Sequence, residues 1–284
     1  MPRVPGAPSA SSPIVVFDSG VGGLTVLHEL LVSLPHEDFV YLGDTARFPY
    51  GERSPEELRR FGLEIAERLL AGGAKLLVVA CNAATSTALR AIEEFVAASE
   101  HPVDVLGVVI PESQQAVEAT HNGRIGLLAT PATVASGAYN RAVRAADPHV
   151  ELVSVACPDL APAIQTGLLF DQRIVDVVRS YCEPLRAAGV DTVILGCTHY
   201  PLIVPMLQRT LGRDVSLISS GAAMARRVEH ALGVRGIGSP NRGEGDYRFL
   251  CTGDVEAFRA LGGRFLQMPL GEVVHVDLAA EVAA

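Results

Sequence analysis

The stretch Gly196-Cys197-Thr198-His199-Tyr200-Pro201 decides the fold that we predict for this chain of 284 residues. It follows a run rich in β-branched residues, Val190 to Leu195, that is typical of a buried strand, so Cys197 lies where a strand ends and a loop begins. A second run, Leu76 to Ala80, ends in the same way at Cys81. In open α/β sheets, ligands bind at this carboxyl end of the strands. The pattern therefore predicts two thiols at ligand-binding strand ends.

The two thiols belong to an internal repeat. Three strand ends recur in each half of the chain: Asp18, Asp44 and Cys81 in the first, and Thr130, Cys157 and Cys197 in the second. The later two ends lie 26 and 63 positions after Asp18, and 27 and 67 positions after Thr130. We interpret this match as a duplicated βαβαβ unit, in which right-handed crossovers give a parallel sheet with aligned strand ends. Two such units facing each other would place Cys81 and Cys197 on opposite walls of one cleft.

The predicted fold class is α/β, with two pseudo-twofold-related domains whose largely parallel sheets are flanked by helices, and with the active site in the interdomain cleft. The last segment is expected to return to the first domain, because the Cys197 strand completes the second. The predicted divisions are a disordered tail over residues 1–12, a first α/β domain over 13–108 plus 217–284, and a second α/β domain over 109–216. Residues 265–270 are predicted to form a final strand, after a helix capped near Asp254 that runs to about Leu261.

Composition limits the functional class. The formal net charge of −9 disfavours nucleic acid or an anionic membrane as a partner. The N-terminal stretch lacks the apolar region of a signal peptide, and no apolar run approaches the roughly 20 residues of a membrane span. The protein is therefore expected in the cytoplasm, where thiols stay reduced. Five cysteines, an odd number without a CxxC pair, disfavour a disulfide framework.

The turn Gly20-Val21-Gly22-Gly23 joins a predicted strand to a predicted helix. Thr25 stands where a dinucleotide fingerprint needs Gly, and the Gly-Lys-Ser/Thr of a phosphate loop is absent. The backbone N–H groups of the turn could hold a substrate carboxylate at the helix N-terminus. A glycine-rich turn without a ligand is the alternative. Asp18, at the strand end, favours a ligand site, since an acid beside a cleft can hold an ammonium group.

The cysteines differ in their surroundings. A lone buried cysteine is more often a small hydrophobe than a nucleophile, and Cys182 and Cys251 are assigned to that group. Cys81 is followed by Asn82, whereas Cys197 is followed by Thr198 and His199, and His199 could orient a thiol or lower its pKa. A zinc site made of Cys81, Cys197 and His199 is the metal alternative, although no compact ligand pair supports it.

Two thiols on opposite faces of one carbon suit an inversion of configuration. One thiolate removes the α-proton of the substrate, and the other thiol delivers a proton to the opposite face. A pyridoxal-phosphate racemase would instead need a lysine for the Schiff base. Lys75 is the only lysine of the chain, and it lies at the start of the Cys81 strand, away from the expected cleft. The sequence therefore disfavours a pyridoxal mechanism.

Taken together, the motifs resemble those of the bacterial glutamate racemases. The resemblance runs from about residue 14 to 225 and rests on Asp18-Ser19-Gly20-Val21-Gly22-Gly23, Gly43-Asp44-Thr45, Phe48-Pro49-Tyr50-Gly51, Ala80-Cys81-Asn82 and Gly196-Cys197-Thr198-His199-Tyr200-Pro201. It implies a cofactor-independent, metal-free interconversion of L- and D-glutamate that supplies D-glutamate for peptidoglycan. By matching positions, it implies catalytic roles for Cys81, Cys197, Asp18 and His199. The matching substrate contacts are Asp18, Ser19, Tyr50, Gly51, Asn82, Ala83, Thr130, Thr198 and His199. The expected partners are glutamate and a second copy in a homodimer.

Two departures from the family pattern keep alternatives open. Gln165 and Thr166 stand where the family usually has an acidic pair, and Ala83 stands where a hydroxyl residue is common. The first change leaves open a regulatory protein that keeps the site without the activity. The second leaves only a backbone contact at position 83. An aspartate or hydantoin racemase is disfavoured by the flanking motifs, and a decarboxylase with one active thiol by the presence of both cysteines.

Overall fold

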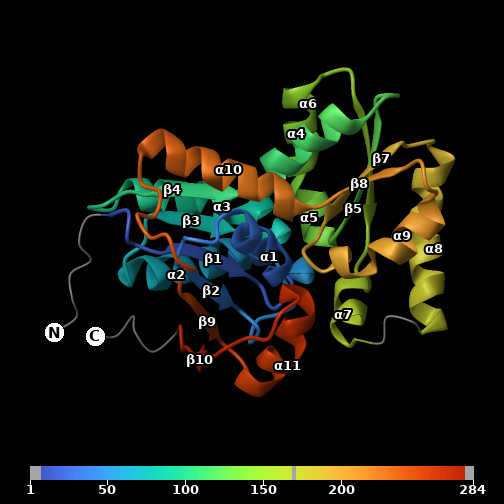
Figure 1. Ribbon diagram of the computed structural model, residues 1–284. Helices are drawn as coiled ribbons and strands as arrows, with labels where there is room; N and C mark the ends of the chain where they lie inside the picture. The colour runs from blue at the N-terminus through green and yellow to red at the C-terminus, as the bar shows by residue number, and fades with distance from the viewer. Residues whose placement is uncertain (1–7, 168–170, 279–284) are drawn as a thin grey trace.

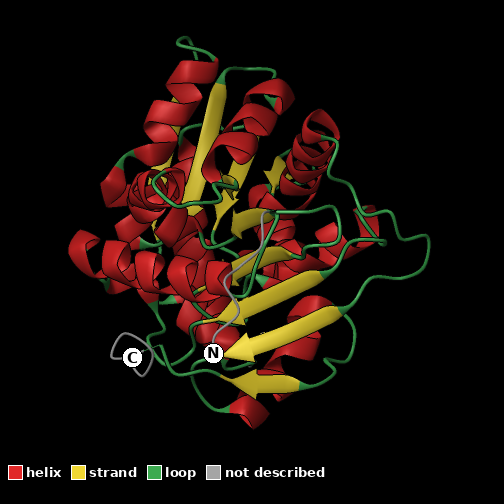
Figure 2. Ribbon diagram, turned by 90° about the vertical axis from the view of Figure 1, so that its left-hand side faces the viewer, coloured by secondary structure: helices red, strands yellow, loops and turns green. Residues whose placement is uncertain are grey.

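The computed structural model describes residues 8–167 and 171–278. Two β-sheets lie side by side in it, each within its own layer of helices (Figure 1). Every strand pairing is parallel. Seen from the side, the strands of the larger sheet run next to one another with helices on both faces (Figure 2). The prediction of two α/β domains with parallel sheets is confirmed.

The larger sheet has six strands in the order β10-β9-β2-β1-β3-β4. They are β1 (Ile14–Asp18), β2 (Phe39–Gly43), β3 (Leu76–Val79), β4 (Asp104–Gly107), β9 (Tyr247–Cys251) and β10 (Val273–His275). All residues of β1 and β3 are buried. Such continuous apolar runs are what the centre of a parallel sheet requires, because helices cover both of its faces.

The smaller sheet repeats the inner part of the larger one. Its strands are β5 (Arg124–Ala129), β6 (Glu151–Ala156), β7 (Thr192–Gly196) and β8 (Ser216–Ile218). Their order, β6-β5-β7-β8, is the order β2-β1-β3-β4 of the first sheet. In this equivalence β3 corresponds to β7, so Cys81, two residues after β3, and Cys197, directly after β7, follow equivalent strands. The duplication expected from sequence spacing is thus present in the strand order.

Helices cover both faces of each sheet. Those of the first domain are α1 (Leu24–Ser33), α2 (Pro55–Ala71), α3 (Asn82–Ala97), α10 (Ser220–Arg235) and α11 (Val255–Leu266), with the short helix η1 (Tyr50–Glu52). Those of the second are α4 (Val109–Ala119), α5 (Pro131–Ser136), α6 (Ala138–Ala146), α7 (Leu160–Gln165), α8 (Gln172–Ala187) and α9 (Val204–Leu211), with η2 (Tyr200–Ile203). Successive residues of a strand point to opposite faces. Accordingly, Ile14 and Val16 share one apolar core with α1, α10 and α11, whereas Val15 and Phe17 share another with α2 and α3.

The chain crosses between the domains twice. It leaves the first sheet after β4 and enters the second domain with α4, and it leaves β8 to return through α10, which packs against α1. The strand pairing of β8 places this return after Ile218, next to the predicted division between residues 216 and 217. Figure 1 shows α10 running from the region between the domains across the first one.

One predicted strand near the C-terminus is wrong. Residues 265 and 266 end helix α11, and the last strand up to residue 278 is β10. The helix continues beyond Leu261 because Phe258 and Phe265, seven positions apart, bury the same apolar face. Its start was predicted correctly, since the Asp254 side chain accepts a hydrogen bond from the Ala257 N–H at 2.7 Å.

The N-terminal segment is anchored by the only lysine. Of the predicted tail, residues 1–7 lie outside the described residues, and residues 10–12 form a turn. Lys75 Nζ donates to the Ala10 carbonyl at 2.7 Å and pairs with Glu37 Oε2 at 2.5 Å. Lys75 is buried at the start of β3, at the end of the sheet away from Cys81.

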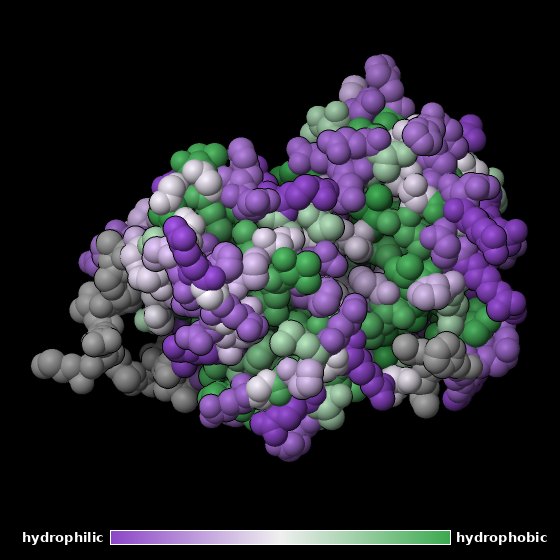
Figure 3. Space-filling model, in the orientation of Figure 1, coloured by the Kyte–Doolittle hydropathy of each residue, from purple (hydrophilic) through white to green (hydrophobic). Residues whose placement is uncertain are grey.

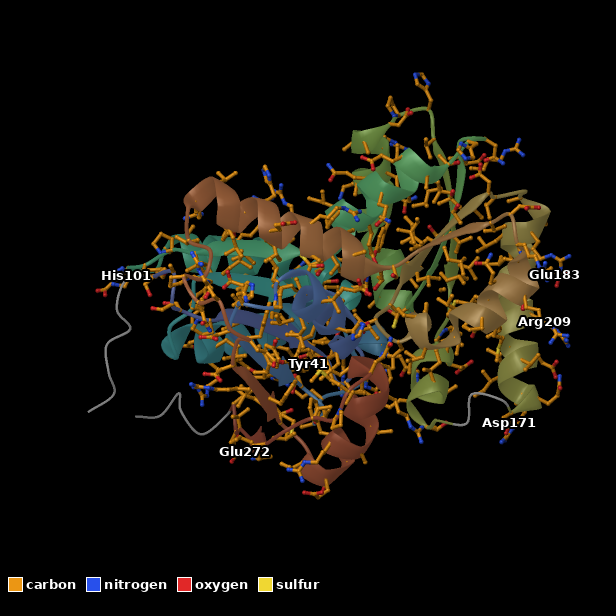
Figure 4. The ribbon with its side chains drawn as sticks, in the orientation of Figure 1. Tyr41, His101, Asp171, Glu183, Arg209 and Glu272 are labelled. Carbon is orange, nitrogen blue, oxygen red and sulfur yellow. The ribbon has the colours of Figure 1, made fainter. Side chains whose placement is uncertain are left out.

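The outer surface is polar. Figure 3 shows hydrophilic residues over the outer edges of both domains, and more hydrophobic residues toward the middle of this face. The charged residues Asp171, Glu183 and Arg209 lie along the outer side of the second domain, as labelled in Figure 4. None of the described helices is both long and apolar enough to cross a bilayer.

Candidate active site

A small cavity lies where the carboxyl ends of the two sheets meet. Its volume is about 30 Å³, roughly the share of one water molecule in the liquid. All predicted site residues except Asp18 line it: Ser19, Tyr50, Gly51, Cys81, Asn82, Ala83, Thr130, Cys197, Thr198 and His199. The two thiols thus come from equivalent strands of the two domains and share one cavity.

Cys81 occupies the N-cap position of α3. Its Sγ accepts a hydrogen bond from the Ala84 N–H at 3.5 Å. Burial and the nearby Asp18 raise the pKa of the Cys81 thiol to about 12, although hydrogen bonds from Ala84 and Ser19 oppose this. The group is therefore a thiol at neutral pH, able to donate a proton, and needs an acceptor before it can act as a base.

Cys197 is paired with His199. Burial lowers the pKa of the His199 imidazole to about 4, so the ring is neutral. Its Nε2 lies 2.9 Å from Oε1, the side-chain amide oxygen of Gln165. This oxygen can only accept a hydrogen bond, so Nε2 carries the hydrogen. Nδ1 then has the free lone pair, and it lies 3.9 Å from Cys197 Sγ, whose own pKa burial raises well above its ordinary value. His199 is in this way held as a proton acceptor for the Cys197 thiol.

Asp18 lies behind the cavity and joins the two domains. It is fully buried, and its Oδ1 accepts from Thr198 Oγ1 of the second domain at 3.2 Å. Burial raises its pKa to about 6, against the effect of hydrogen bonds from Gly23, Gly20, Thr198 and Cys81. The carboxyl group thus lies within reach of the Cys81 thiol.

The glycine turn was predicted to offer its N–H groups to a substrate carboxylate, and the structure gives them another partner. The Gly20 N–H donates to Asp18 Oδ2 at 3.1 Å, and the Gly23 N–H also lowers the pKa of Asp18. Gly22 lies at the contact between the two domains. A Cβ there would lie 2.5 Å from His199 Nδ1, so only glycine lets the His199 loop approach. The N–H groups of the turn therefore bind the Asp18 carboxylate, and Gly22 allows the close contact between the domains.

The remaining predicted residues, Tyr50, Gly51 and Thr130, line another part of the cavity wall. The Tyr50 hydroxyl donates to Asp44 Oδ2, and Tyr41, labelled in Figure 4, donates from β2 to the Gly20 carbonyl at 2.7 Å. Thr130 caps α5 by accepting from the Thr133 N–H at 3.4 Å. A Cβ on Gly51 would lie 2.8 Å from the Cβ of Thr130, so these residues from opposite domains are in close contact.

The family follows from a sequence comparison. A family model for Asp/Glu/hydantoin racemases matches residues 25–228. The chain belongs to this racemase family. A glutamate racemase of Acidothermus cellulolyticus is 44% identical over 262 residues, which cover 92% of this chain and 97% of that protein. The expected amino-acid racemase class is thereby confirmed.

Solved structures of racemases have the same fold. A glutamate racemase isoform from Bacillus anthracis superposes with a TM-score of 0.88 at 38% identity, covering 94% of this chain and 98% of that one. A glutamate racemase from Francisella tularensis, solved in complex with D-glutamate, gives a TM-score of 0.88 at 30% identity, covering 95% and 99%.

Some residues of this racemase site had no sequence signal. Phe265 packs on the His199 ring with centroids 5.1 Å apart, opposite a contact at 5.4 Å from Phe48, which belongs to the quoted Phe48-Pro49-Tyr50-Gly51 motif. Pro158, Ala161 and the adjoining Pro162 also line the cavity, but apolar side chains carry no chemical signature in a sequence. For the zinc alternative, the described part of the chain contains no group of three His, Cys, Asp or Glu side chains placed to hold a metal.

Proposed function

We propose that this racemase interconverts L- and D-glutamate by proton transfer between two thiols, without a cofactor. The observation that carries the proposal is the shared cavity of Cys81 and Cys197, which follow equivalent strands of a duplicated fold. The glutamate racemases that resemble the chain over more than nine-tenths of its length support the choice of substrate. D-glutamate made in this way would supply peptidoglycan synthesis in the cytoplasm.

Each thiol has its own proton acceptor. His199 Nδ1 can take the proton of Cys197, and the Asp18 carboxylate can take that of Cys81. The resulting thiolate removes the α-proton, so the C–H electron pair stays on the α-carbon as a carbanion. The opposite thiol then protonates the other face and becomes a thiolate, while the first sulfur is again a thiol beside its protonated acceptor. The resting state returns when that acceptor releases its proton to water and the second thiolate takes up a proton from water. By resemblance to the family, Cys197 acts on L-glutamate and Cys81 on D-glutamate.

The pre-placed polar groups fit the charges of an amino acid. The negative charge of Asp18 behind the cavity is suited to stabilise the ammonium group electrostatically, and the hydroxyls of Ser19, Thr130 and Thr198 are suited to the carboxylates. Ala83 offers only its backbone. The homodimer expected from the sequence remains a prediction.

Circular dichroism with purified protein tests the proposal. L-glutamate should lose its optical signal at the same rate with and without added pyridoxal phosphate or a chelator, whereas L-aspartate should turn over far more slowly. Cys81→Ser and Cys197→Ser should each nearly abolish racemisation, because inversion needs a group on both faces. Turnover that persists in either variant contradicts the two-thiol mechanism, and an inactive wild-type protein would favour the regulatory alternative.

A further inference from the structure

Glu112 is a buried carboxyl group with no part in the chemistry above. It lies in the first turn of α4 and is fully buried. Within residues 8–167 and 171–278, no arginine, lysine or histidine forms an ion pair with it, and burial alone dominates the shift of its pKa. A buried carboxyl group is costly unless its oxygens are hydrogen-bonded. Its partners therefore indicate what the group does.

The partners come from three other helices. Glu112 Oε2 accepts from the hydroxyl of Tyr139 on α6 and from Nδ2 of Asn82 on α3, the latter at 3.1 Å. Oε1 accepts from the hydroxyl of Ser220, the first residue of α10. Helices α4 and α10 are the segments by which the chain enters and leaves the second domain. Glu112 thus ties both crossings to the helix that begins beside Cys81.

Asn82 is the partner that belongs to the active site. Its Nδ2 donates both to Glu112 and to the Tyr139 hydroxyl, the latter at 2.8 Å. Asn82 lines the cavity, whereas Glu112 and Tyr139 do not. The amide nitrogen therefore faces away from the cavity, and the other end of the amide, Oδ1, is left on the cavity side. Among the described residues Oδ1 is buried and has no hydrogen-bond partner.

A buried acceptor without a partner is uncommon in folded proteins and calls for a ligand donor. The ammonium group of an amino acid is such a donor. We propose that Glu112 is a positioning residue which, with Tyr139, holds the Asn82 amide so that Oδ1 accepts a hydrogen bond from the substrate ammonium. The inference rests on the proposed function, because it names the substrate group that this orientation serves.

Loss of Glu112 would allow the amide to turn. The freed Tyr139 hydroxyl could then donate to Asn82 Oδ1, which would present Nδ2, a donor, to the ammonium group. Two donors cannot pair, so binding would weaken. The thiols and their proton acceptors do not touch Glu112, and the chemical step would be affected less than binding.

Replacement of Glu112 with leucine and with glutamine separates hydrogen bonding from packing. Glu112→Leu keeps much of the volume but accepts nothing, and we expect KM for glutamate to rise at least about tenfold with kcat within about threefold. Glu112→Gln should keep both constants within about threefold. Its carbonyl can accept from Asn82 and Tyr139, and its NH₂ can donate to the Ser220 oxygen. Burial raises the pKa of Glu112 to about 8, so an uncharged amide resembles the carboxylic acid present near neutral pH, in which Oε1 would carry the proton and donate to the Ser220 oxygen in place of accepting from it.

Two further variants, each lacking one hydroxyl group, form a matched pair. They test the same role even if the Glu112→Leu protein does not fold. Tyr139→Phe removes a partner from the oxygen that holds Asn82 and should raise KM by about three- to tenfold. Ser220→Ala removes the partner of the other oxygen and should leave KM unchanged. Far-UV circular dichroism and thermal unfolding check the fold of each variant. Equal KM values in Tyr139→Phe and Ser220→Ala, or a loss confined to kcat, would overturn the positioning role.

Isothermal titration calorimetry with D-glutamate measures Kd without requiring racemisation. It therefore tests the role of Glu112 separately from the proposed reaction. A wild-type protein that binds D-glutamate without racemising it would refute the proposed reaction, and the ratios of Kd between variants would still test Glu112. An unchanged Kd in a folded Glu112→Leu protein would refute the role of Glu112 whatever the racemisation rate. Absence of glutamate binding by the wild-type protein would refute both.

Discussion

At the scale of single residues, the protonation of His199 depends on a neutral neighbour. Gln165 accepts from Nε2 at 2.9 Å and adds no charge, so burial keeps the ring neutral with a pKa of about 4. A carboxylate at this position would favour the imidazolium, and opposite charges at such distances shift pKa values by about 1–3 units.

We therefore expect Gln165→Glu to raise the pKa of His199 and to move the acidic limb of kcat/KM upward by about 1 pH unit or more. Gln165→Leu removes the acceptor that fixes the tautomer, and it should lower kcat/KM about tenfold without that shift. The pH dependence of racemisation, followed by circular dichroism, measures both effects. Identical profiles for the two variants would show that Gln165 does not control His199.

The Asp18 carboxylate is expected to lower the free energy of unfolding while raising kcat/KM. Burial raises its pKa from an ordinary 3.8 to about 6, so between these values the folded protein holds a proton that the unfolded chain has lost. Stability therefore falls as the pH rises through this window, and the full cost is present above pH 6. Asp18→Asn should lower kcat/KM by about 10²-fold, because it removes a pre-organised electrostatic partner.

The same variant should unfold at a higher temperature than the wild-type protein at pH 7.5, by an amount worth about 1–3 kcal/mol. The difference should vanish at pH 4, where the native carboxyl group is protonated. Thermal unfolding at the two pH values measures this. A variant with wild-type activity would show that Asp18 is only a structural residue of the turn.

At the scale of elements, the turn between β1 and α1 determines how closely the domains approach. A methyl group on Gly22 would collide with Thr198 Oγ1 and lie 2.5 Å from His199 Nδ1. Gly22→Ala should therefore displace the His199 loop and lower kcat/KM by about 10²-fold, because small misplacements of catalytic groups are that costly.

Gly233→Ala is the matched control, since a Cβ at that position of α10 meets no neighbour within 4 Å. It should leave activity unchanged and raise the unfolding temperature slightly, because alanine is the better helix former. If Gly22→Ala were as active as Gly233→Ala, close approach at the turn would not matter for catalysis.

The elements near the site were largely predictable, and those far from it less so. Strand ends marked by Asp18, Cys81 and Cys197 carry both an apolar run and a polar residue, which is a strong local pattern. Residues 255–266 were harder to assign, because Phe265 and the residues after it also fit a short strand. Only packing against α1 and β10 decides for the helix.

At the scale of the whole molecule, the sequence spacing revealed the duplication but not the contacts that cross it. The matched offsets predicted a duplicated βαβαβ unit, and the structure adds the strand order, in which β6-β5-β7-β8 repeats β2-β1-β3-β4. The Glu112 cluster joins side chains 30 and 108 positions away along the chain. No periodicity marks such a set, and Tyr139 and Ser220 look like ordinary surface residues in the sequence.

The size of the cavity leads to a prediction about the whole molecule. A volume of about 30 Å³ is far below the roughly 300–1,000 Å³ of typical ligand sites. The closed cavity is too small for glutamate, and we expect the two domains to move apart when the substrate enters, which would also expose Cys81 and Cys197. The other three cysteines lie within the domains, so this motion should leave them buried.

Labelling with iodoacetamide, followed by peptide mass spectrometry, measures this motion. Cys81 and Cys197 should react first, with rates that increase with pH because burial raises the pKa of both thiols. Saturating D-glutamate should slow labelling of these two cysteines by at least about tenfold, since the closed domains shield them and the ligand fills the space between. Cys157, Cys182 and Cys251 serve as internal controls and should stay unmodified until the protein unfolds. Equal labelling of all five cysteines would indicate general unfolding rather than domain motion, and labelling of Cys81 and Cys197 unaffected by glutamate would place the substrate outside this cavity.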